Sequence, residues 1–508
     1  MLDSKQISRR QFLRRAGGVT ALFILNGCGM GQGATTTIPT SARPSITPMA
    51  RGIPTTGVVR DVATATPSAT TVTSPTVATS TASAAADLVT SNQITPALLA
   101  HIRAIAHPLS EPGDLDPLLE RIGDAHYVLL GEASHGTAEY YTWRTEITKR
   151  LVREKGFSFV GVEGEWVDCY RVNAYVKGWP SSGTSARQVL NRYDAWPTWM
   201  WANEEVAQLV EWLREHNDAV QDRSKVGFYG LDLYGAVDAA NELLQYLGRR
   251  DPKAARLARR VRQCVESHEE DQSEFLDPTG RAPEDCRKHR EALLTALAAK
   301  AAQYWREDPE AFFNAEQNAL VARNADRFYT ELDSWNIRDT HMADTLDRLI
   351  HHHGPGAKAV VWEHNTHVGD ARATNMVAEG LINLGQLARE RHGVEDVVLV
   401  GFGSHRGTVI AARMWGGQWE RMVLPPSQKG SYEDAFHRAG RENKLIIFSD
   451  AVDPGLLLEP RGHRAIGVEY SHEYSQDGAY VPSILPKRYD AFLYLDETRA
   501  LHPLHQER

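Results

Sequence analysis

The sequence is short of several features that would assign it to a reaction class at once. It contains only four cysteines, and no two of them form the CxxC pair that is typical of zinc and redox sites. Its GEASHG segment at 131–136 differs from the G-x-S-x-G turn of serine hydrolases, which disfavours Ser134 as a nucleophile. No basic stripe follows the N-terminus and the formal net charge is −9, so nucleic acid is not expected as a partner.

The composition that is present is that of a globular chain. Hydrophobic residues make up 42% and charged residues 24% of the 508 residues, which suffices for one large domain or two ordinary ones. Twelve tryptophans are a generous number, and they fit either a bulky apolar ligand or an ordinary core. Six of them occur near the segments that carry the candidate site: Trp143, Trp166, Trp196, Trp199, Trp201 and Trp362.

Residues 1–31 are expected to form an export signal rather than part of the fold. The segment SRRQFLR at 8–14 matches the twin-arginine pattern, and the apolar run at 16–25 is too short to span a bilayer. The following LNGC resembles a bacterial lipobox with Cys28 as the lipidated residue. The sequence therefore predicts export by the twin-arginine route and a lipid anchor in the membrane, at the cell membrane or cell surface. Plain signal-peptidase cleavage or an uncleaved anchor are the alternatives.

Residues 32–88 are predicted to form a disordered tether. They consist mainly of Thr, Ser, Pro, Ala and Val, a composition that cannot bury a core and stays extended. Such a segment suits a spacer between a membrane and a folded catalytic domain, which we place at 89–508.

The folded part is organised around the segment 126–166. Two short apolar runs, at 127–130 and 159–162, have the length and residue types of strands, and 137–154 shows helical periodicity between them. A strand, a helix and a strand in so short a segment form a βαβ unit, so the two strands are expected to be parallel.

Acidic residues and a histidine follow both of these strands. Glu132 and His135 come directly after the first strand, and Glu163 comes after the second. Ligands of open parallel sheets bind outside the carboxyl ends of the strands, so these three side chains are expected to converge. Glycines at 131, 136 and 164 are expected to let the backbone turn sharply there.

Two later segments repeat this pattern. A strand predicted at 225–230 leads to Asp232, and a strand predicted at 358–361 leads to His364 and His367. One such ending is common by chance, whereas four in one chain indicate a site. If the four strands are parallel neighbours, all of these side chains line one cleft.

The rest of the chain predicts an α/β fold with a mostly parallel central sheet flanked by helices. After Asp232 four long helical segments follow without a strand between them, and we interpret about 236–334 as a long helical insertion. This insertion could act as a lid over the cleft, or it could form a layer without substrate contact. A single helix is expected at 376–391. Four further segments are expected to extend the sheet: 396–401, 444–448, 464–468 and 491–495.

The remaining cysteines leave two interpretations open. If Cys28 carries a lipid, Cys169, Cys264 and Cys286 are left. A bridge between Cys264 and Cys286 can form outside the cytoplasm, and buried free thiols are the alternative.

The residues at the strand ends support hydrolysis. A histidine that titrates near neutral pH, such as His135, can take a proton from water, and a nearby glutamate would fix its tautomer. His364 and His367 are three residues apart and would share a face of a helical turn.

The ordered set of motifs resembles the erythromycin esterase family, which groups macrolide esterases with succinoglycan-biosynthesis-like homologues. The segments that carry the resemblance are GEASHG, FVGVEGEW, EEVAQLVEWLREHN, FYGLD, IRDTHMADTL and VVWEHNTH, in this order. They cover about 118–368 well and the remainder weakly. The resemblance implies a hydrolase that opens an ester or lactone of a small molecule without a metal or another cofactor.

The resemblance also implies roles for individual residues. The histidine that activates water in the family falls on His135, and its acidic neighbours fall on Glu132 and Glu163. The positions that bind substrate or support the base fall on Arg144, Asp232, Arg338, His364 and His367. At these positions Arg144 or Arg338 could stabilise a developing oxyanion or form a structural ion pair.

Other function classes stay open. A metal-dependent hydrolase would use the N and O ligands that the same glutamate and histidine cluster supplies, namely Glu132, His135, Glu163, His364 and His367. A tethered binding protein would capture a ligand in a Trp-lined cleft without turning it over. A glycosidase pair of Glu132 and Glu163 is a lesser option because no sugar-binding signature accompanies it.

Overall fold

The structure is a computed structural model that describes residue 88 and residues 90–221, 224–270, 284–451, 454–471 and 479–504. The predicted export signal at 1–31, its Cys28, and the predicted tether up to residue 87 lie outside the described residues.

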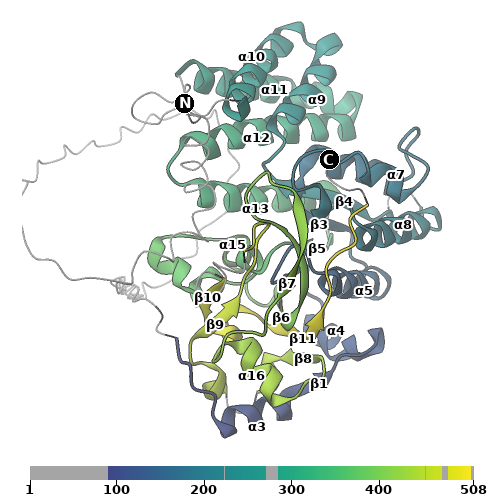
Figure 1. Cartoon of the computed structure of the whole chain (residues 1–508). Coiled ribbons are helices and arrows are strands. Elements are labelled where there is room, and N and C mark those ends of the chain that lie inside the picture. The colour runs from purple at the N-terminus through teal and green to yellow at the C-terminus, as the bar shows by residue number, and fades with distance from the viewer. Residues whose placement is uncertain are drawn as a thin grey trace, which may run out of the picture. The chain divides into compact units, whose positions relative to one another are not determined.

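A sheet of nine strands forms the centre of the fold, in the order β1-β8-β11-β6-β2-β5-β3-β4 with β7 paired to β6 (Figure 1). From β11 to β4 every neighbouring pair of strands is parallel. The parallel strands are β11 (Ala491–Thr498), β6 (Val397–Ala412), β2 (Tyr127–Leu130), β5 (Ala359–Trp362), β3 (Phe159–Glu165) and β4 (Gly227–Asp232). The antiparallel strands are β1 (Ala106–Pro108), β8 (Lys444–Ile447) and β7 (Trp419–Leu424). The prediction that the four strands with acid or histidine endings are parallel neighbours is therefore confirmed.

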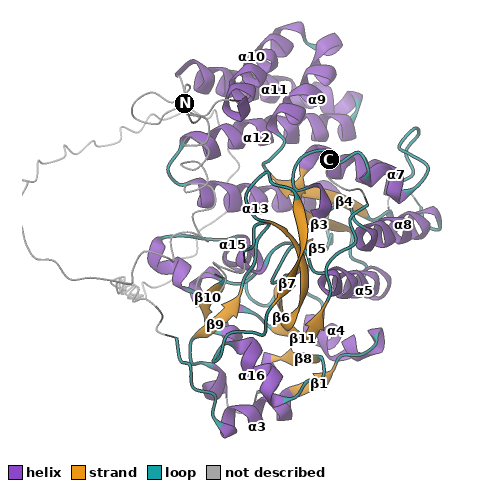
Figure 2. Ribbon diagram, in the orientation of Figure 1, coloured by secondary structure: helices purple, strands orange, loops and turns teal. Residues whose placement is uncertain are grey.

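Helices cover both faces of this sheet because successive strand side chains point to opposite sides. Val128 and Leu130 of β2 join one hydrophobic cluster, while Leu129 joins the other. Helices α4 (Asp116–Ile122), α5 (Ala138–Lys155) and α8 (Glu204–Asp218) pack on the first side. Helices α3 (Pro96–Ile105), α13 (Ser334–His353), α15 (Leu384–His392) and α16 (Tyr432–Ala439) pack on the second (Figure 2). The short helices are α6 (Trp166–Val176), α7 (Ala186–Leu190), α14 (Asn365–Val368) and α18 (Leu485–Arg488).

The helix of the βαβ unit forms where its periodicity predicts it. Its apolar residues recur on one side and are buried, and it ends at Gly156, which adopts a left-handed φ of 68°. The helix therefore returns the chain from the end of β2 to the start of β3, which makes the two strands parallel.

Four helices follow β4 in sequence and share a hydrophobic cluster of their own. They are α9 (Ala236–Arg250), α10 (Pro252–Glu270), α11 (Glu284–Glu307) and α12 (Pro309–Thr330). A disulfide between Cys264 and Cys286 joins α10 to α11, so the bridge forms and the free-thiol alternative is wrong for this pair. Cys169 is a free, buried thiol. Within the described ranges, no helix is both long enough and apolar enough to cross a bilayer.

Two predictions about the C-terminal third are wrong. The segment 376–391 is not one helix, because a 3-10 turn (Asn375–Glu379) stops at Gly380 in a left-handed conformation and α15 begins afresh after its N-cap, Asn383. The segment 464–468 does not extend the central sheet. Only Arg464 of this segment lies in a strand, β9 (Arg461–Arg464), which pairs with β10 (Tyr480–Ser483) in a separate two-stranded sheet. Residues 466 and 468 make single backbone hydrogen bonds to Ala133 and Ala412 instead.

Candidate active site at the carboxyl ends of the parallel strands

A histidine–carboxylate dyad follows β2. Nδ1 of His135 lies 2.8 Å from Oε1 of Glu132, and both side chains are buried. A carboxylate only accepts hydrogen bonds, so Nδ1 carries a proton, and in a neutral imidazole the lone pair is then on Nε2. Among the described residues Nε2 has no hydrogen-bond partner. In its neutral form the imidazole of this dyad presents a free nitrogen that can accept a proton.

Arg144 of α5 binds the glutamate of this dyad. Its Nη2 donates to Oε2 of Glu132 at 2.7 Å, and its guanidinium lies over the rings of Tyr141 and Trp362 at 4.3 and 4.7 Å. Arg144 is 0% exposed. Of the two roles that the sequence leaves open for this arginine, the geometry matches the structural ion pair, because the side chain has no surface that a substrate could reach.

A second arginine binds the acidic side chains at the ends of β3 and β4. Arg338 of α13 donates to both carboxylate oxygens of Asp232, from Nε at 3.0 Å and from Nη2 at 2.6 Å, and to Oε1 of Glu163 at 2.8 Å. Burial alone would lower the pKa of Arg338, but the negative charges of Asp232 and Glu163 raise it above its usual range. Tyr234 lies under the guanidinium at 5.1 Å. Arg338 is therefore a permanent cation that ties α13 to two strand ends.

His367 carries a positive charge in this cluster. Its Nδ1 lies 2.9 Å from Asp339 and its Nε2 lies 3.4 Å from Oε1 of Glu163. Burial would lower the pKa of His367, but Asp339 and Glu163 raise it to about 10. Nη1 of Arg338 lies 3.1 Å from the same Nε2, yet a protonated Nε2 cannot accept from it. We assign the proton to Nε2 because two carboxylates flank the ring, and Trp335 stacks on it at 4.6 Å.

Glu163 stays ionised under these neighbours. Burial would raise the pKa of Glu163, but the charges of His367, His135 and Arg338 hold it well below its usual range. Its second oxygen, Oε2, accepts from the backbone N–H of His364 at 2.8 Å. Glu163 therefore connects the Arg338 cluster to the loop that carries His364.

His364 joins the two clusters. Its ring centre lies 4.9 Å from that of His135. Nδ1 of His364 accepts from the backbone N–H of Thr366, so Nε2 carries the proton. Burial and the nearby His135 lower the pKa of His364 well below its usual range, so the ring is neutral. By distance and angle Nε2 makes no hydrogen bond within the described part of the chain, although the backbone of Ala133 acts on the ring as a hydrogen-bond partner and raises its pKa.

The structure thus brings all eight predicted site residues together, but it corrects two local expectations. His364 and His367 do not present a common face, since His364 turns to His135 and His367 to Asp339. Neither Gly131 nor Gly136 has a left-handed backbone; a side chain at Gly136 would instead collide with the backbone of Ile410. The glycine allows close approach of β6 rather than a sharp turn.

Other predicted features belong to the core. Ser134 hydrogen-bonds to the hydroxyl of Thr137, and no described histidine bonds its Oγ. Trp166, Trp199, Trp201 and Trp362 are buried in the hydrophobic clusters, so most of the noted tryptophans fill the core. Trp196 is half-buried and packs on Trp415, whose ring centre is 4.7 Å away.

Sequence reasoning missed Glu363, which ends β5 directly before His364. It is 0% exposed, and neither of its carboxylate oxygens has a hydrogen-bond partner among the described residues. Burial, together with the charges of Glu163 and Asp339, raises the pKa of Glu363 well above its usual range. Burial thus favours the protonated form of this acid, and the rule that flagged the other strand endings could have found it.

Two further supports were also missed. Asp339, which orients His367, directly follows Arg338 in sequence and could have been noticed on that ground. The side chain of Asn365 contacts Nε2 of His463 at 3.1 Å, and Nδ1 of His463 lies 2.7 Å from Glu433. No local sequence pattern predicts this series of contacts, because Asn365, His463 and Glu433 are widely separated along the sequence.

Metal-ligand geometry is not formed by any group of three or more His, Cys, Asp or Glu side chains in the described ranges. Glu163, His364 and His367 are the residues that could contribute to such a set. Glu163 is bound by Arg338 and His367 by Asp339, so a metal ion would have to displace these partners.

The fold and the strand-end site define a class of open, mostly parallel α/β proteins, which solved structures share. A succinoglycan biosynthesis protein matches with a TM-score of 0.62 and 21% identity, over 80% of this chain and 98% of its own. A protein from Bacillus cereus matches with a TM-score of 0.67 and 22% identity, over 81% and 99%. A mutant of erythromycin esterase EreC in its open conformation matches with a TM-score of 0.56 and 16% identity, over 77% and 97%. At these identities the likeness shows the fold alone.

The chain belongs to the erythromycin esterase family, whose family model matches residues 152–498, more than half of the chain. Erythromycin esterase type II of Escherichia coli is 28% identical over 127 residues, which is 25% of this chain and 28% of that protein. The family prediction is therefore confirmed, and the match reaches further toward the C-terminus than the motifs indicated. Glu132, His135 and Arg144 precede the matched range, so their place in the site comes from the geometry.

Proposed function

We propose that the protein is a hydrolase that opens a carboxylic ester or lactone of a small molecule, with His135 as the general base. The observation that carries this proposal is the dyad: Glu132 holds Nδ1 of His135 at 2.8 Å, and Nε2 has no partner among the described residues. A neutral imidazole in this state accepts a proton without first breaking a hydrogen bond. Membership of the erythromycin esterase family supports the reaction class.

In the proposed reaction, Nε2 of His135 takes a proton from water as the water oxygen attacks the ester carbonyl carbon. Glu132 then stabilises the imidazolium, and Arg144 holds Glu132 in place through its hydrogen bond. When the carbon–oxygen bond of the ester breaks, the imidazolium returns its proton to the departing alkoxide. The products are a carboxylic acid and an alcohol, and in a lactone both stay in one molecule.

The oxyanion of the tetrahedral intermediate needs a donor close to His135. Nε2–H of His364 is the best placed donor, because its ring is neutral and lies 4.9 Å from that of His135. Arg338 and the protonated His367 add positive charge behind it. We assign His364 this role and regard Arg338 as the support of the acidic residues around it.

We further propose that α9–α12 act as a lid on one side of the site. Tyr234, which follows β4, lies under Arg338 and meets Phe328 of α12 edge to face at 5.7 Å. The helical layer thus contacts a residue that bears on the site. Slower amide hydrogen exchange in α9–α12 on binding of a product carboxylate would support the lid, and unchanged exchange there would reject it.

The first experiment is mass spectrometry of a macrolide lactone incubated with the purified protein and with His135→Ala. We expect the substrate to gain one water with the wild type and the rate to fall by about 10²–10⁴ in the variant, the range for loss of a general base. His107→Ala, which removes a half-buried histidine of β1 that pairs with Asp450, is the matched control and should keep full activity. If His135→Ala hydrolyses every wild-type substrate at the wild-type rate, the proposal fails.

Glu132→Gln tests the dyad separately. A glutamine cannot stabilise the imidazolium by charge and leaves Arg144 without its partner, so kcat should fall by about 10²–10³ while the substrate still binds. Ser134→Ala should leave the rate unchanged, because Ser134 bonds to Thr137 rather than to a base. A large loss in Ser134→Ala with little effect of Glu132→Gln would favour a serine nucleophile instead.

The two rival interpretations predict different results with the same sample. A metal-dependent hydrolase would lose activity on chelation and regain it with one metal, whereas the dyad should work after chelation. A binding protein would hold the ligand tightly and return it unchanged. Metal content and product formation, measured on one active preparation, separate all three.

We also propose that the protein is exported by the twin-arginine route and anchored through Cys28. The motifs at 8–14 and 25–28 support the proposal, and so does the disulfide between Cys264 and Cys286, since disulfides persist in oxidising compartments.

A further inference from the structure

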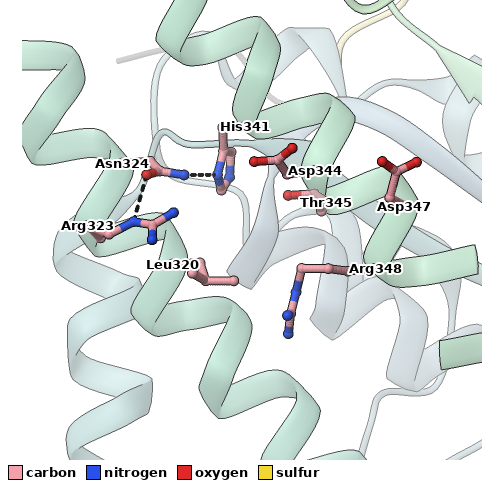
Figure 3. Close-up of a pocket in the computed structure, with 8 residues that line it drawn as sticks. All are labelled: Leu320, Arg323, Asn324, His341, Asp344, Thr345, Asp347 and Arg348. Atoms are coloured by element: carbon pink, nitrogen blue, oxygen red, sulfur yellow. Dashed lines mark hydrogen bonds between the residues drawn. The ribbon is translucent and has the colours of Figure 1, made fainter. Parts of the chain in front are cut away.

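A cavity lies between α12 and α13, where the four added helices meet the core. Its volume is about 320 Å³, at the lower end of the range for small-molecule pockets. Figure 3 shows the side chains that line it: Leu320, Arg323, Asn324, His341, Asp344, Thr345, Asp347 and Arg348. None of these residues takes part in the proposed ester hydrolysis, so the cavity needs an explanation of its own.

Most of the charges around this cavity are neutralised by neighbours. Arg348 donates to Glu316 and Gln317. Asp344 and Asp347 both pair with Arg391, at 2.9 and 2.7 Å. One arginine thus serves two carboxylates, and Nε2 of His392 lies 2.8 Å from the other oxygen of Asp347.

Arg323 is the exception. Its one hydrogen bond within the described part of the chain runs from Nε to Oδ1 of Asn324 at 2.9 Å, and no described carboxylate pairs with it. Burial lowers the pKa of Arg323, but an arginine stays charged in a protein. Its two terminal nitrogens are therefore free to bind a planar anion in the two-pronged manner that guanidinium groups favour.

A chain of hydrogen bonds leads from this arginine toward the active site. Oδ1 of Asn324 accepts from Arg323, so its Nδ2 is the atom that donates to Nδ1 of His341 at 2.8 Å (Figure 3). Nε2 of His341 consequently carries the proton, and burial lowers the pKa of this ring to about 4. The backbone of Asp232 acts on the same ring as a hydrogen-bond partner and raises its pKa. The carboxylate of Asp232 accepts a hydrogen bond from Arg338.

We propose that this cavity is a binding site for a small organic anion, a carboxylate or a phosphate ester, whose acidic group binds Arg323. Leu320 supplies an apolar contact for the rest of the ligand, since the cavity is larger than a bare ion requires. The site is separate from the catalytic dyad and stands whether or not the proposed hydrolysis is correct. A bound ligand contacts α13, three residues along the helix from Arg338.

The test is calorimetric titration of the full chain with three probes at constant ionic strength: inorganic phosphate, acetate and butyrate. We expect one binding event per chain that weakens about ten- to hundredfold in Arg323→Gln, the loss of charge-assisted hydrogen bonds. Tighter binding of phosphate identifies a phosphate ester as the natural class. Tighter binding of butyrate than of acetate and phosphate identifies an apolar carboxylate.

Arg259→Gln, which removes an exposed arginine of α10, is the matched control and should bind as the wild type does. Arg323→Lys keeps the charge but not the two-pronged geometry and should bind with intermediate affinity, which covers the case in which Arg323→Gln folds poorly. Absence of saturable binding by the wild type overturns the proposal. Equal binding by the wild type, Arg323→Gln and Arg323→Lys overturns it too, because the anion would then bind elsewhere.

Discussion

The charged residues of the site determine one another's protonation state. Glu163 and Glu363 are both buried glutamates close to His367, yet burial raises the pKa of Glu363 while the surrounding charges outweigh burial and lower the pKa of Glu163. Glu163 meets Arg338 and a backbone N–H, whereas neither oxygen of Glu363 has a described partner. Hydrogen bonding and not burial alone separates the two acids.

This contrast predicts how the stability of the protein depends on pH. The folded-state pKa of Glu363 is raised, so the stability it contributes is present below the ordinary glutamate pKa and is lost as the pH rises toward the raised value. Glu363→Gln removes the cost of ionising a buried acid. We therefore expect its melting temperature to exceed that of the wild type by a margin that grows with pH. Melting curves across acidic to alkaline pH measure the effect.

Glu433→Gln is the matched control because Glu433 is equally buried but its pKa is lowered. Burial would raise that pKa, but the bond and charge of His463 and the charge of Arg464 outweigh it. The charge of Glu433 therefore stabilises the fold above the ordinary glutamate pKa, and Glu433→Gln should melt earlier than the wild type at neutral pH, with a gap that closes on acidification. If the difference in melting temperature between each variant and the wild type did not change with pH, the assigned charge states would be wrong.

At the scale of elements, α13 is fixed to the sheet through its first turns. Arg338 bonds to Asp232 at the end of β4 and to Glu163 near the end of β3, and Asp339 bonds to His367 after β5. One helix thereby reaches three neighbouring strand ends. The position of α13 and the geometry of the site are consequently set by the same contacts.

Arg338→Met should lower the free energy of unfolding by about 3–5 kcal/mol, because it leaves two buried carboxylates without their cation. The double variant Arg338→Met with Asp232→Asn should lose less than the sum of the single losses. Arg348→Met, on the same helix, removes an ion pair whose partner is partly exposed and should cost about 1 kcal/mol or less. Denaturant titration gives all four values, and strict additivity of the double variant would contradict the assigned pair.

The disulfide between α10 and α11 is a second constraint at this scale. It closes a loop with a sequence separation of 22, for which the loop-entropy relation gives about 3 kcal/mol. Cys264→Ser with Cys286→Ser should therefore speed amide exchange in α10 and α11 and leave the rate of hydrolysis unchanged, since neither cysteine touches the dyad. A reducing agent should reproduce the effect in the wild type and do nothing to the variant. Unchanged exchange in all of these samples would mean that the bridge does not form in solution.

At the scale of the whole molecule, the proposed export places the disulfide where it persists and the site outside the cytoplasm. We expect the wild type in the membrane fraction and labelled by a fatty acid, and Cys28→Ser in the soluble exported fraction without label. Arg9→Lys with Arg10→Lys should keep the protein in the cytoplasm, because the twin-arginine pair is the recognised signal. Membrane association of Cys28→Ser at the wild-type level would exclude the lipid anchor.

The sequence by itself determined the parallel strands, the crossover helix and the acid or histidine at each strand end. These features are local: strand and helix periodicity fix the elements, and parallel connection fixes the edge at which their ends meet. Six of the eight predicted site residues could be found this way, whereas Arg144 and Arg338, which lie on helices, came from the resemblance to the family.

Tertiary structure decided what those residues do to one another. Glu163 and Arg338 are 175 positions apart, so no local pattern reveals that the pair forms or that His367 between them is a cation. The burial of Arg144 and the raised pKa of Glu363 likewise depend on groups brought in from other strands and helices. Protonation and pairing respond to distances of a few ångströms in a medium of low polarity, and only the folded chain sets those distances.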